Sequence, residues 1–209
     1  MNNVINRVAT ALHFRLLRFF SMQNFANRDN IVYLTFDDGP ETGITEFVLS
    51  ELDKFNFKAT FFCRGDNAER NRSLVTALRD KGHSVGNHTY SHLHSFDVTT
   101  DAYVNDIERA GTVLHTRLFR PPHGILRIKT YFKIFRKYRI VYWTINSEDS
   151  MLEAFDLEHA ISKMKKNTKS GDIILFHFCH KHEKETVQLL PLYLSWLSKQ
   201  GYQSKAIEE

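Results

Sequence analysis

After residue 30 the sequence alternates short runs of β-branched and aromatic residues with helical patterns of roughly ten to fifteen residues. Alternation of this kind is typical of repeated βα units around a parallel sheet. The runs expected to be strands are residues 31–36, 58–63, 84–87, 118–120, 140–145, 172–177 and 203–206. The helical patterns between them cover residues 45–55, 72–82, 99–114, 127–138, 157–167 and 186–201. No linker interrupts the series, which indicates one main domain.

The chain length limits the kind of barrel that these units can form. The chain has 209 residues, whereas a regular eight-fold (β/α) barrel usually takes about 250 residues. We therefore expect an α/β fold of the irregular (β/α) barrel type with about seven strands. An open doubly wound sheet is the structural alternative, but no G-x-G-x-x-G sequence follows the first expected strand to indicate dinucleotide binding.

Residues 1–28 are expected to form an N-terminal amphipathic helical extension, with the main domain at residues 29–209. Apolar side chains recur there at helical spacing (Val4, Val8, Leu12 and Leu16), and three arginines lie off that stripe (Arg7, Arg15 and Arg18). The arginines argue against a secretory signal and against a bilayer span, so we expect a cytoplasmic protein. The helix either packs on the domain or makes a peripheral contact with an anionic membrane surface through residues 4–20.

Charge and cysteine content narrow the partners and the compartment. The formal net charge is +4, and the basic residues are scattered along the chain. We therefore expect no nucleic-acid partner, because nucleic-acid binding surfaces carry clustered basic residues. Cys63 and Cys179 lie in apolar runs and are expected to be buried thiols in a reducing compartment. Cys179 lies two residues after His177, yet a core thiol is favoured over a metal contact.

Polar residues follow the ends of several expected strands. In barrels and open parallel sheets alike, ligand sites form where the carboxyl ends of the strands emerge. The residues selected by this rule come from five separate segments: Asp37 and Asp38, His88 and His92, Arg120, Asp149, and His177. Each has an ordinary structural role as an alternative, such as a turn cap or a core histidine. Their common position at strand ends favours one shared site.

The adjacent carboxylates of Asp37 and Asp38 predict a cation nearby, because neighbouring carboxylates repel each other. His88 and His92 are four residues apart, so one helical turn would place both imidazoles on the same face. Two histidines and one carboxylate leave positions open on Zn²⁺ for water and substrate, as hydrolysis requires. One aspartate would then bind the cation while the other serves as a base. The histidine pairs at 92–94 and 180–182 are interpreted as chance clusters.

Four motifs carry a family resemblance: "TFDDGP", "HTYSH", "RPPHG" and "LFH". Their order and approximate spacing resemble those of NodB-like polysaccharide deacetylases, carbohydrate esterase family 4, over residues 30–206. The resemblance implies a distorted (β/α) barrel of the NodB-homology type and metal-dependent hydrolysis of the amide of N-acyl sugars. The implied cofactor is a divalent metal, Zn²⁺ in the first place, with Co²⁺ or Ni²⁺ as alternatives.

The resemblance also implies residue roles. It makes Asp38, His88 and His92 the metal ligands, and Asp37 the general base that removes a proton from metal-bound water. His177 becomes the general acid that protonates the leaving amine, and a positioned acid or base contributes about 10²–10⁴ in rate.

Further residues would support the base, the acid and the substrate. By the resemblance, Arg120 grips the base carboxylate through two hydrogen bonds, and Asp149 orients His177. The substrate and oxyanion side would contain Pro122, Trp143 and the backbone N–H of His123. Ser150 stands where the family usually has a tryptophan, which removes stacking surface for a sugar ring.

The leading functional hypothesis is a metal-dependent hydrolase that removes N-acetyl groups from an amino sugar in an oligosaccharide, polysaccharide or lipid-linked glycan. The N-acetylated glycan is the expected partner. A deformylase, an O-deacetylase or a hydrolase of small amides using the same site is the first alternative. A non-catalytic glycan-binding relative is the second alternative. Retention of both a base and an acid around the metal argues against it, since binding alone needs neither.

Overall fold

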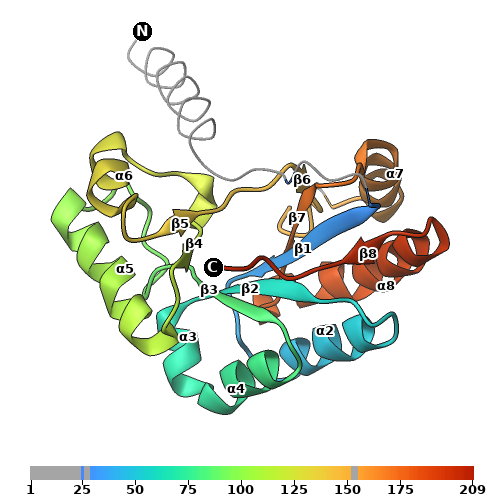
Figure 1. Ribbon diagram of the computed structural model, residues 1–209, viewed down its shortest axis with the longest axis horizontal. Coiled ribbons are helices and arrows are strands. Elements are labelled where there is room, and N and C mark those ends of the chain that lie inside the picture. Colours follow the sequence, from blue (N-terminus) through green and yellow to red (C-terminus); the bar gives the residue numbers. More distant parts are fainter. Residues whose placement is uncertain (1–24, 26–28, 152–154) are drawn as a thin grey trace, which may run out of the picture.

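The computed structural model describes residue 25 and residues 29–151 and 155–209. Its strands form one parallel sheet in the order β5-β4-β3-β2-β1-β7-β6, and β8 pairs with β1. The strands are β1 (Ile31–Asp37), β2 (Ala59–Cys63), β3 (Ser84–Asn87), β4 (Leu118–Phe119), β5 (Arg139–Ile140), β6 (Ile145–Asn146), β7 (Ile173–His177) and β8 (Gln203–Ser204). The sheet is curved, with helices around its outside (Figure 1).

The helices follow the strands in the expected alternation. They are α2 (Ile44–Asp53), α3 (Gly65–Arg70), α4 (Arg72–Asp80), α5 (Thr100–Leu114), α6 (Ile128–Ile134), α7 (Leu157–Asn167) and α8 (Glu183–Lys199), with short 3₁₀ turns at Pro122–Gly124 and His180–His182. The sequence pattern missed α3, which is a short polar helix without an apolar stripe. The Thr99 hydroxyl accepts a hydrogen bond from the N–H of Ala102 and so caps α5, as the sequence predicts.

The one expected strand at residues 140–145 is wrong, because this run divides into β5 and β6 at opposite ends of the sheet. β5 pairs with β4, and β6 pairs with β7. Between them, the carbonyl groups of Val141 and Tyr142 accept hydrogen bonds from the Arg120 side chain rather than from a neighbouring strand. Among the described residues, no ladder joins β5 to β6, so the sheet curls without closing. This confirms the prediction of an irregular (β/α) barrel.

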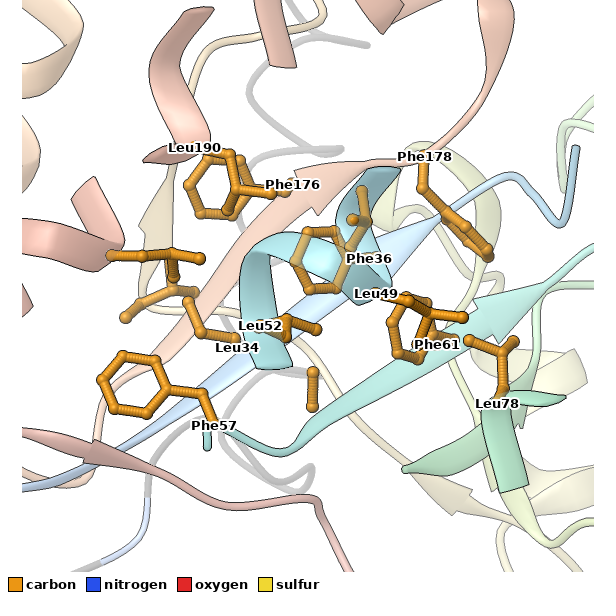
Figure 2. Packing of buried hydrophobic residues seen from close by; sticks show 14 of the residues in the cluster. Leu34, Phe36, Leu49, Leu52, Phe57, Phe61, Leu78, Phe176, Phe178 and Leu190 are labelled. Carbon is orange, nitrogen blue, oxygen red and sulfur yellow. The ribbon is translucent and has the colours of Figure 1, made fainter. Parts of the chain in front are cut away.

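The largest apolar cluster lies between the sheet and the helices α2 and α8. Figure 2 shows Phe36, Phe61 and Phe176 packed together beneath α2. The ring centroid of Phe36 lies 5.0 Å from that of Phe61 and 5.7 Å from that of Phe176. All three side chains are fully buried. Burying such a side chain contributes about 1.5–3 kcal/mol. The cluster therefore fixes the relative positions of β1, β2 and β7.

β1 is the central strand and carries the first pair of carboxylates to the sheet edge. It pairs with β2, β7 and β8, and nearly all of its residues are buried, as expected for a strand covered on both faces. The β1–β7 register sets Asp37 beside His177. Two residues that are far apart in the sequence thus share one position at the carboxyl edge of the sheet.

The expected N-terminal helical extension lies outside the described residues, apart from Phe25. Phe25 stacks on Tyr33 of β1 with ring centroids 3.9 Å apart, and its N–H donates to the carbonyl of Gly171. In the part of the chain that the structure describes, no helix combines the length and the apolar character needed to cross a bilayer.

We predict that Gly86→Ala in β3 destabilises the fold. A Cβ atom at Gly86 would lie 2.5 Å from the Phe62 ring, and that ring packs 4.2 Å from the Arg120 guanidinium carbon. Overpacking of this kind costs about 1–3 kcal/mol. This cost exceeds the stabilisation of about 0.4–1 kcal/mol that Gly→Ala provides by reducing the conformational entropy of the unfolded chain. Urea unfolding should therefore show a lower free energy of unfolding. Thr76→Ala on the exposed face of α4 is the control and should change this quantity by less than about 0.5 kcal/mol. Equal stability of Gly86→Ala and the wild type would contradict the packing described here.

Candidate active site

The predicted strand-end residues converge around one cavity at the carboxyl edge of the sheet. The cavity has a volume of about 390 Å³. Its lining includes the predicted residues Asp37, Asp38, His88, His92, His123, Trp143, Ser150 and His177. It also includes five residues without a predicted role: Gly124, Asn146, Leu175, Lys181 and His182. The lining joins three of the five predicted strand-end segments, those of Asp37 and Asp38, of His88 and His92, and of His177, whereas Arg120 and Asp149 are not part of it.

Asp38, His88 and His92 form a group able to hold a cation. Their potential ligand atoms all lie within 4.8 Å of one another. Asp38 Oδ1 lies 3.5 Å from His88 Nε2 and 3.0 Å from His92 Nε2. This oxygen is buried and has no hydrogen-bond partner among the described residues. A buried carboxylate oxygen between two imidazole nitrogens fits a divalent cation that accepts nitrogen and oxygen ligands, such as Zn²⁺.

The two histidines meet through a loop, so the expected helical turn is wrong. Residues 88–99 form no helix. Thr89 and His92 have φ angles of 62° and 57°, in the left-handed region that a right-handed helix excludes. The Asn87 side chain accepts from the N–H of Thr89, and the Asp106 carboxylate accepts from the N–H of Tyr90. These side chains take backbone donors that a helix would otherwise use, and the loop bends both imidazoles toward Asp38.

The ring of His88 is held in one orientation. Its Nδ1 atom lies 2.8 Å from the Arg120 carbonyl oxygen and can only donate to it, which leaves Nε2 without a proton in the neutral ring. Burial lowers the pKa of His88 to about 4. The imidazole is therefore neutral at physiological pH and directs a bare Nε2 at Asp38, which is the form that binds a metal.

The Asp38 carboxylate is the opposite case, because it is held in the charged form. Burial alone would raise its pKa, but the contact with the His92 imidazole and the positive charge of His177 outweigh burial. The pKa of Asp38 consequently lies well below its ordinary value. A carboxylate that stays ionised at all ordinary pH values suits a cation ligand.

Arg120 is fully buried and contacts Asp37 through one hydrogen bond. Its Nη1 donates to Asp37 Oδ1 at 2.8 Å and to the Thr35 hydroxyl at 2.8 Å. The other guanidinium donors bind the carbonyls of Val141 and Tyr142. The expected two-bond grip on the base is therefore wrong, because the chain between β5 and β6 takes the remaining donors. Asp37 Oδ2 stays free of Arg120 and lies 3.7 Å from His88 Nε2.

His177 forms a tight pair with Asp149, as predicted. Its Nδ1 lies 2.7 Å from Asp149 Oδ1, and its backbone N–H donates to Asp149 Oδ2 at 2.8 Å. The Thr186 hydroxyl donates to the same Oδ2 at 3.0 Å. Burial opposes a charge on His177, but Asp149 and then Asp38 and Asp37 raise the pKa of His177 to about 9. The imidazolium is thus the main form at neutral pH, with Nε2 as the proton available to the cavity.

The residues assigned to substrate differ in their relation to the cavity. His123 is exposed, and its ring centroid lies 4.8 Å from that of His92. Trp143 lines the cavity. Ser150, which stands where the family usually has a tryptophan, lines it as well. Pro122 is buried and does not belong to the lining. The oxyanion role of the His123 N–H stays a prediction.

His182 is a cavity residue that the sequence interpretation missed. It was grouped with His180 as a chance cluster, yet it is 4% exposed, and its ring centroid lies 4.9 Å from that of His177. The signal that could have found it is its place directly after β7, at the same edge of the sheet as the other strand-end residues. His180, by contrast, is exposed and pairs with Glu183.

Comparisons with known proteins show which proteins this chain resembles. The family model described as Polysaccharide deacetylase matches residues 26–143. The chain is similar to a peptidoglycan-N-acetylglucosamine deacetylase of Bacillus cereus, with 34% identity over 190 residues, 88% of this chain and 89% of the relative. Among solved structures it resembles the Bc1960 peptidoglycan N-acetylglucosamine deacetylase in complex with 4-naphthalen-1-yl-N-oxidanyl-benzamide, with a TM-score of 0.82, 28% identity and 90% coverage of each chain. BA3943, a CE4 family pseudoenzyme from Bacillus anthracis, shares the fold, with a TM-score of 0.75 and 22% identity over 88% of this chain and 66% of that chain.

We predict that Asp149→Asn lowers the pKa of His177. The carboxylate favours the charged imidazolium, so its loss should move the pKa from about 9 toward the ordinary value of 6.5. Titration of the His177 ring protons by NMR in the metal-free protein measures this shift. Thr186→Val is the matched control, because it removes a hydrogen bond to Asp149 without removing the charge, and it should shift the pKa much less. An unchanged His177 pKa in Asp149→Asn would show that the Asp149 carboxylate does not keep His177 protonated.

Proposed function

The chain belongs to the polysaccharide deacetylase family, and from this premise we propose that it hydrolyses the N-acetyl amide of an amino sugar in a glycan. The observation that carries the proposal is the placement of a carboxylate and a charged imidazole at one cavity. Asp37 and His177 occupy paired positions on adjacent strands, and both line that cavity beside the cation ligands. Amide hydrolysis needs a base for the water and an acid for the leaving amine, and this arrangement provides both.

Asp38, His88 and His92 would hold the cation. When bound, a divalent cation supplies Lewis-acid chemistry, which polarises the acyl carbonyl and makes water more acidic. Asp37 then accepts the proton of the attacking water at Oδ2, the oxygen that Arg120 does not bind. Arg120 fixes the other oxygen at 2.8 Å, so the base approaches the water in one orientation.

His177 donates its Nε2 proton to the nitrogen of the leaving amine. The C–N bond of the tetrahedral adduct breaks as this proton is transferred, which yields a free amino sugar and acetate. Asp149 binds the Nδ1 side and keeps the ring charged until the transfer. The backbone N–H of His123 is proposed to donate to the oxygen that becomes negative in the adduct.

N-acetylglucosamine in peptidoglycan is the substrate that the relatives' names support. The Bacillus cereus relative and the Bc1960 enzyme are both named for that activity. In this chain, Leu175 and Trp143 give the cavity apolar surface that suits an acetyl methyl group and a sugar face. Ser150 also lines the cavity, at the position where the family usually has a tryptophan.

The non-catalytic alternative has a precedent in the fold, because BA3943 is a CE4 family pseudoenzyme. Against it stands the buried charge arrangement of this chain. Arg120 and Asp149 are both completely buried. Arg120 donates a hydrogen bond to Asp37, and Asp149 accepts hydrogen bonds from His177. Burial of charged groups is costly, and glycan binding alone does not need it. The cytoplasmic location, the membrane contact through residues 4–20 and the role of residues 1–28 stay predictions, which cell fractionation and liposome binding test.

We predict opposite outcomes for the two neighbouring aspartates. Asp37→Asn should lower kcat by at least about 10²-fold, because it removes the base. It should still bind Zn²⁺ as the wild type does. Asp38→Asn should weaken Zn²⁺ binding, because it removes a direct ligand. The loss should exceed the loss of about 10–100-fold that follows when a residue supporting a ligand is removed. Acetate release from chitooligosaccharides and competition with a chelator measure the two quantities. Unchanged turnover in Asp37→Asn would reject the base, and loss of Zn²⁺ in that variant would reverse the two assignments.

We further predict a preference for the N-acetyl group. A matched panel of N-acetyl, N-formyl and O-acetyl sugars separates the deacetylase from its enzymatic alternatives. The N-acetyl oligomer should exceed the N-formyl oligomer in kcat/KM by about 10-fold or more, because one methyl group in an apolar pocket is worth about 10–200-fold. A higher kcat/KM on the O-acetyl sugar would favour an esterase, and a higher value on the N-formyl sugar would favour a deformylase.

A further inference from the structure

A second group of metal-ligating side chains adjoins the first, and two of its three members, Asp38 and His182, line the cavity. Asp38, Cys179 and His182 each offer one ligand atom, and these atoms all lie within 4.8 Å of one another. Cys179 Sγ lies 3.9 Å from Asp38 Oδ2. The proposed mechanism uses neither Cys179 nor His182.

The chain after β7 brings this cysteine and this histidine together. Cys179 precedes the 3₁₀ turn His180–His182, and the N–H of His182 donates to the Cys179 carbonyl at 3.1 Å. The N–H of Phe178 donates to the Asp37 carbonyl at 3.0 Å, which ties this turn to the end of β1. The backbone therefore holds a thiol and an imidazole side by side next to Asp38.

His182 has an unexplained polar atom. Its side chain is 4% exposed, and its Nδ1 is buried without a hydrogen-bond partner among the described residues. Leaving a buried polar atom without a partner costs about 1–3 kcal/mol. His182 also lines the cavity, so a ligand entering from the cavity can reach it. A cation bound by His182 would give this buried nitrogen a partner.

The two oxygens of Asp38 face the two groups separately. Oδ1 lies 3.0 Å from His92 Nε2 and 3.5 Å from His88 Nε2, whereas Oδ2 is the oxygen near Cys179. A carboxylate in this position can bind one cation through each oxygen. Paired cations in two-metal sites lie about 3.5–4 Å apart, which a shared carboxylate can span.

We propose that Asp38 Oδ2, Cys179 and His182 form a second cation site, which fills after the first and takes thiophilic divalent ions such as Zn²⁺, Co²⁺ and Cd²⁺. Thiolate and imidazole ligands select these ions over Mg²⁺ and Ca²⁺. The proposal extends the proposed function, because Asp38 would join the two sites. On binding, Cys179 gives up its thiol proton to solvent, and the thiolate sulfur forms the bond to the metal.

The other cysteine provides a matched comparison. Cys63 is completely buried at the end of β2, and its Sγ lies 3.6 Å from the Phe61 carbonyl. Among the described residues, it belongs to no group able to hold a metal. Cys63 is thus an ordinary core thiol, whereas Cys179 faces a carboxylate and an imidazole.

The test is a Co²⁺ titration of the metal-free full-length chain with its thiols reduced. Bound metal per chain is measured by elemental analysis after gel filtration, and sulfur ligation by the thiolate-to-Co²⁺ charge-transfer absorption in the near ultraviolet. We expect two ions per wild-type chain, with the absorption arising during the second equivalent. Cys179→Ala and His182→Ala should each bind one ion, and Cys179→Ala should lose the absorption. Cys63→Ala should behave as the wild type. Thermal unfolding of each metal-free variant checks that it is folded.

Other outcomes overturn the proposal. A wild-type chain that binds one ion only, a second ion without the sulfur absorption, or an absorption that survives in Cys179→Ala would each exclude the second site. These results leave the first site and the proposed hydrolysis intact when one ion still binds and acetate is still released. A wild-type chain that binds no ion would overturn both proposals. The two failures are therefore distinguishable.

Discussion

The contact between Arg120 and Asp37 is the interaction on which both the fold and the site depend. The guanidinium has no exposure to solvent, and it donates to Asp37, Thr35 and two carbonyls of the chain between β5 and β6. These carbonyls would otherwise need a neighbouring strand, because buried backbone acceptors are almost always paired. Arg120 thus allows the sheet to curl without closing, and the same side chain orients the carboxylate at the end of β1.

Burying these charges also explains why the site suits a cation. The cavity region contains the carboxylates of Asp37, Asp38 and Asp149, and opposite them the cations Arg120 and protonated His177. Arg120 pairs with Asp37 and His177 pairs with Asp149. Asp38 faces the imidazoles of His88 and His92 and the thiol of Cys179, and His88 is held neutral. An ionised carboxylate without a permanent cationic partner is expensive in a buried position. A divalent ion between Asp38 and the imidazoles compensates this charge. The stability of the buried carboxylate and the proposed hydrolysis therefore both require a cation at this position.

The sequence predicted the order of βα units well, because buried parallel strands and amphipathic helices leave strong periodic patterns. The rule that sites form at the carboxyl ends of strands then selected Asp37, His88 and His177, which do meet at one cavity. The local sequence pattern gave the wrong secondary structure where contacts between distant residues determine the backbone conformation. The loop that carries His92 is shaped by the distant Asp106 carboxylate, and the break within residues 140–145 depends on Arg120. His182 was missed because the two histidines at 180 and 182 were interpreted as a chance cluster, although the segment follows β7 at the edge of the sheet that carries the site.

The central claim is that one cation lies among Asp38, His88 and His92 while Asp37 stays outside its ligand shell. Anomalous X-ray diffraction at the zinc absorption edge tests it most directly, on crystals of the protein loaded with one equivalent of Zn²⁺. The account predicts one anomalous peak at bonding distance from Asp38 Oδ1 and the Nε2 atoms of His88 and His92, with Asp37 still hydrogen-bonded to Arg120. A peak elsewhere, or a peak that includes Asp37 as a ligand, would contradict it.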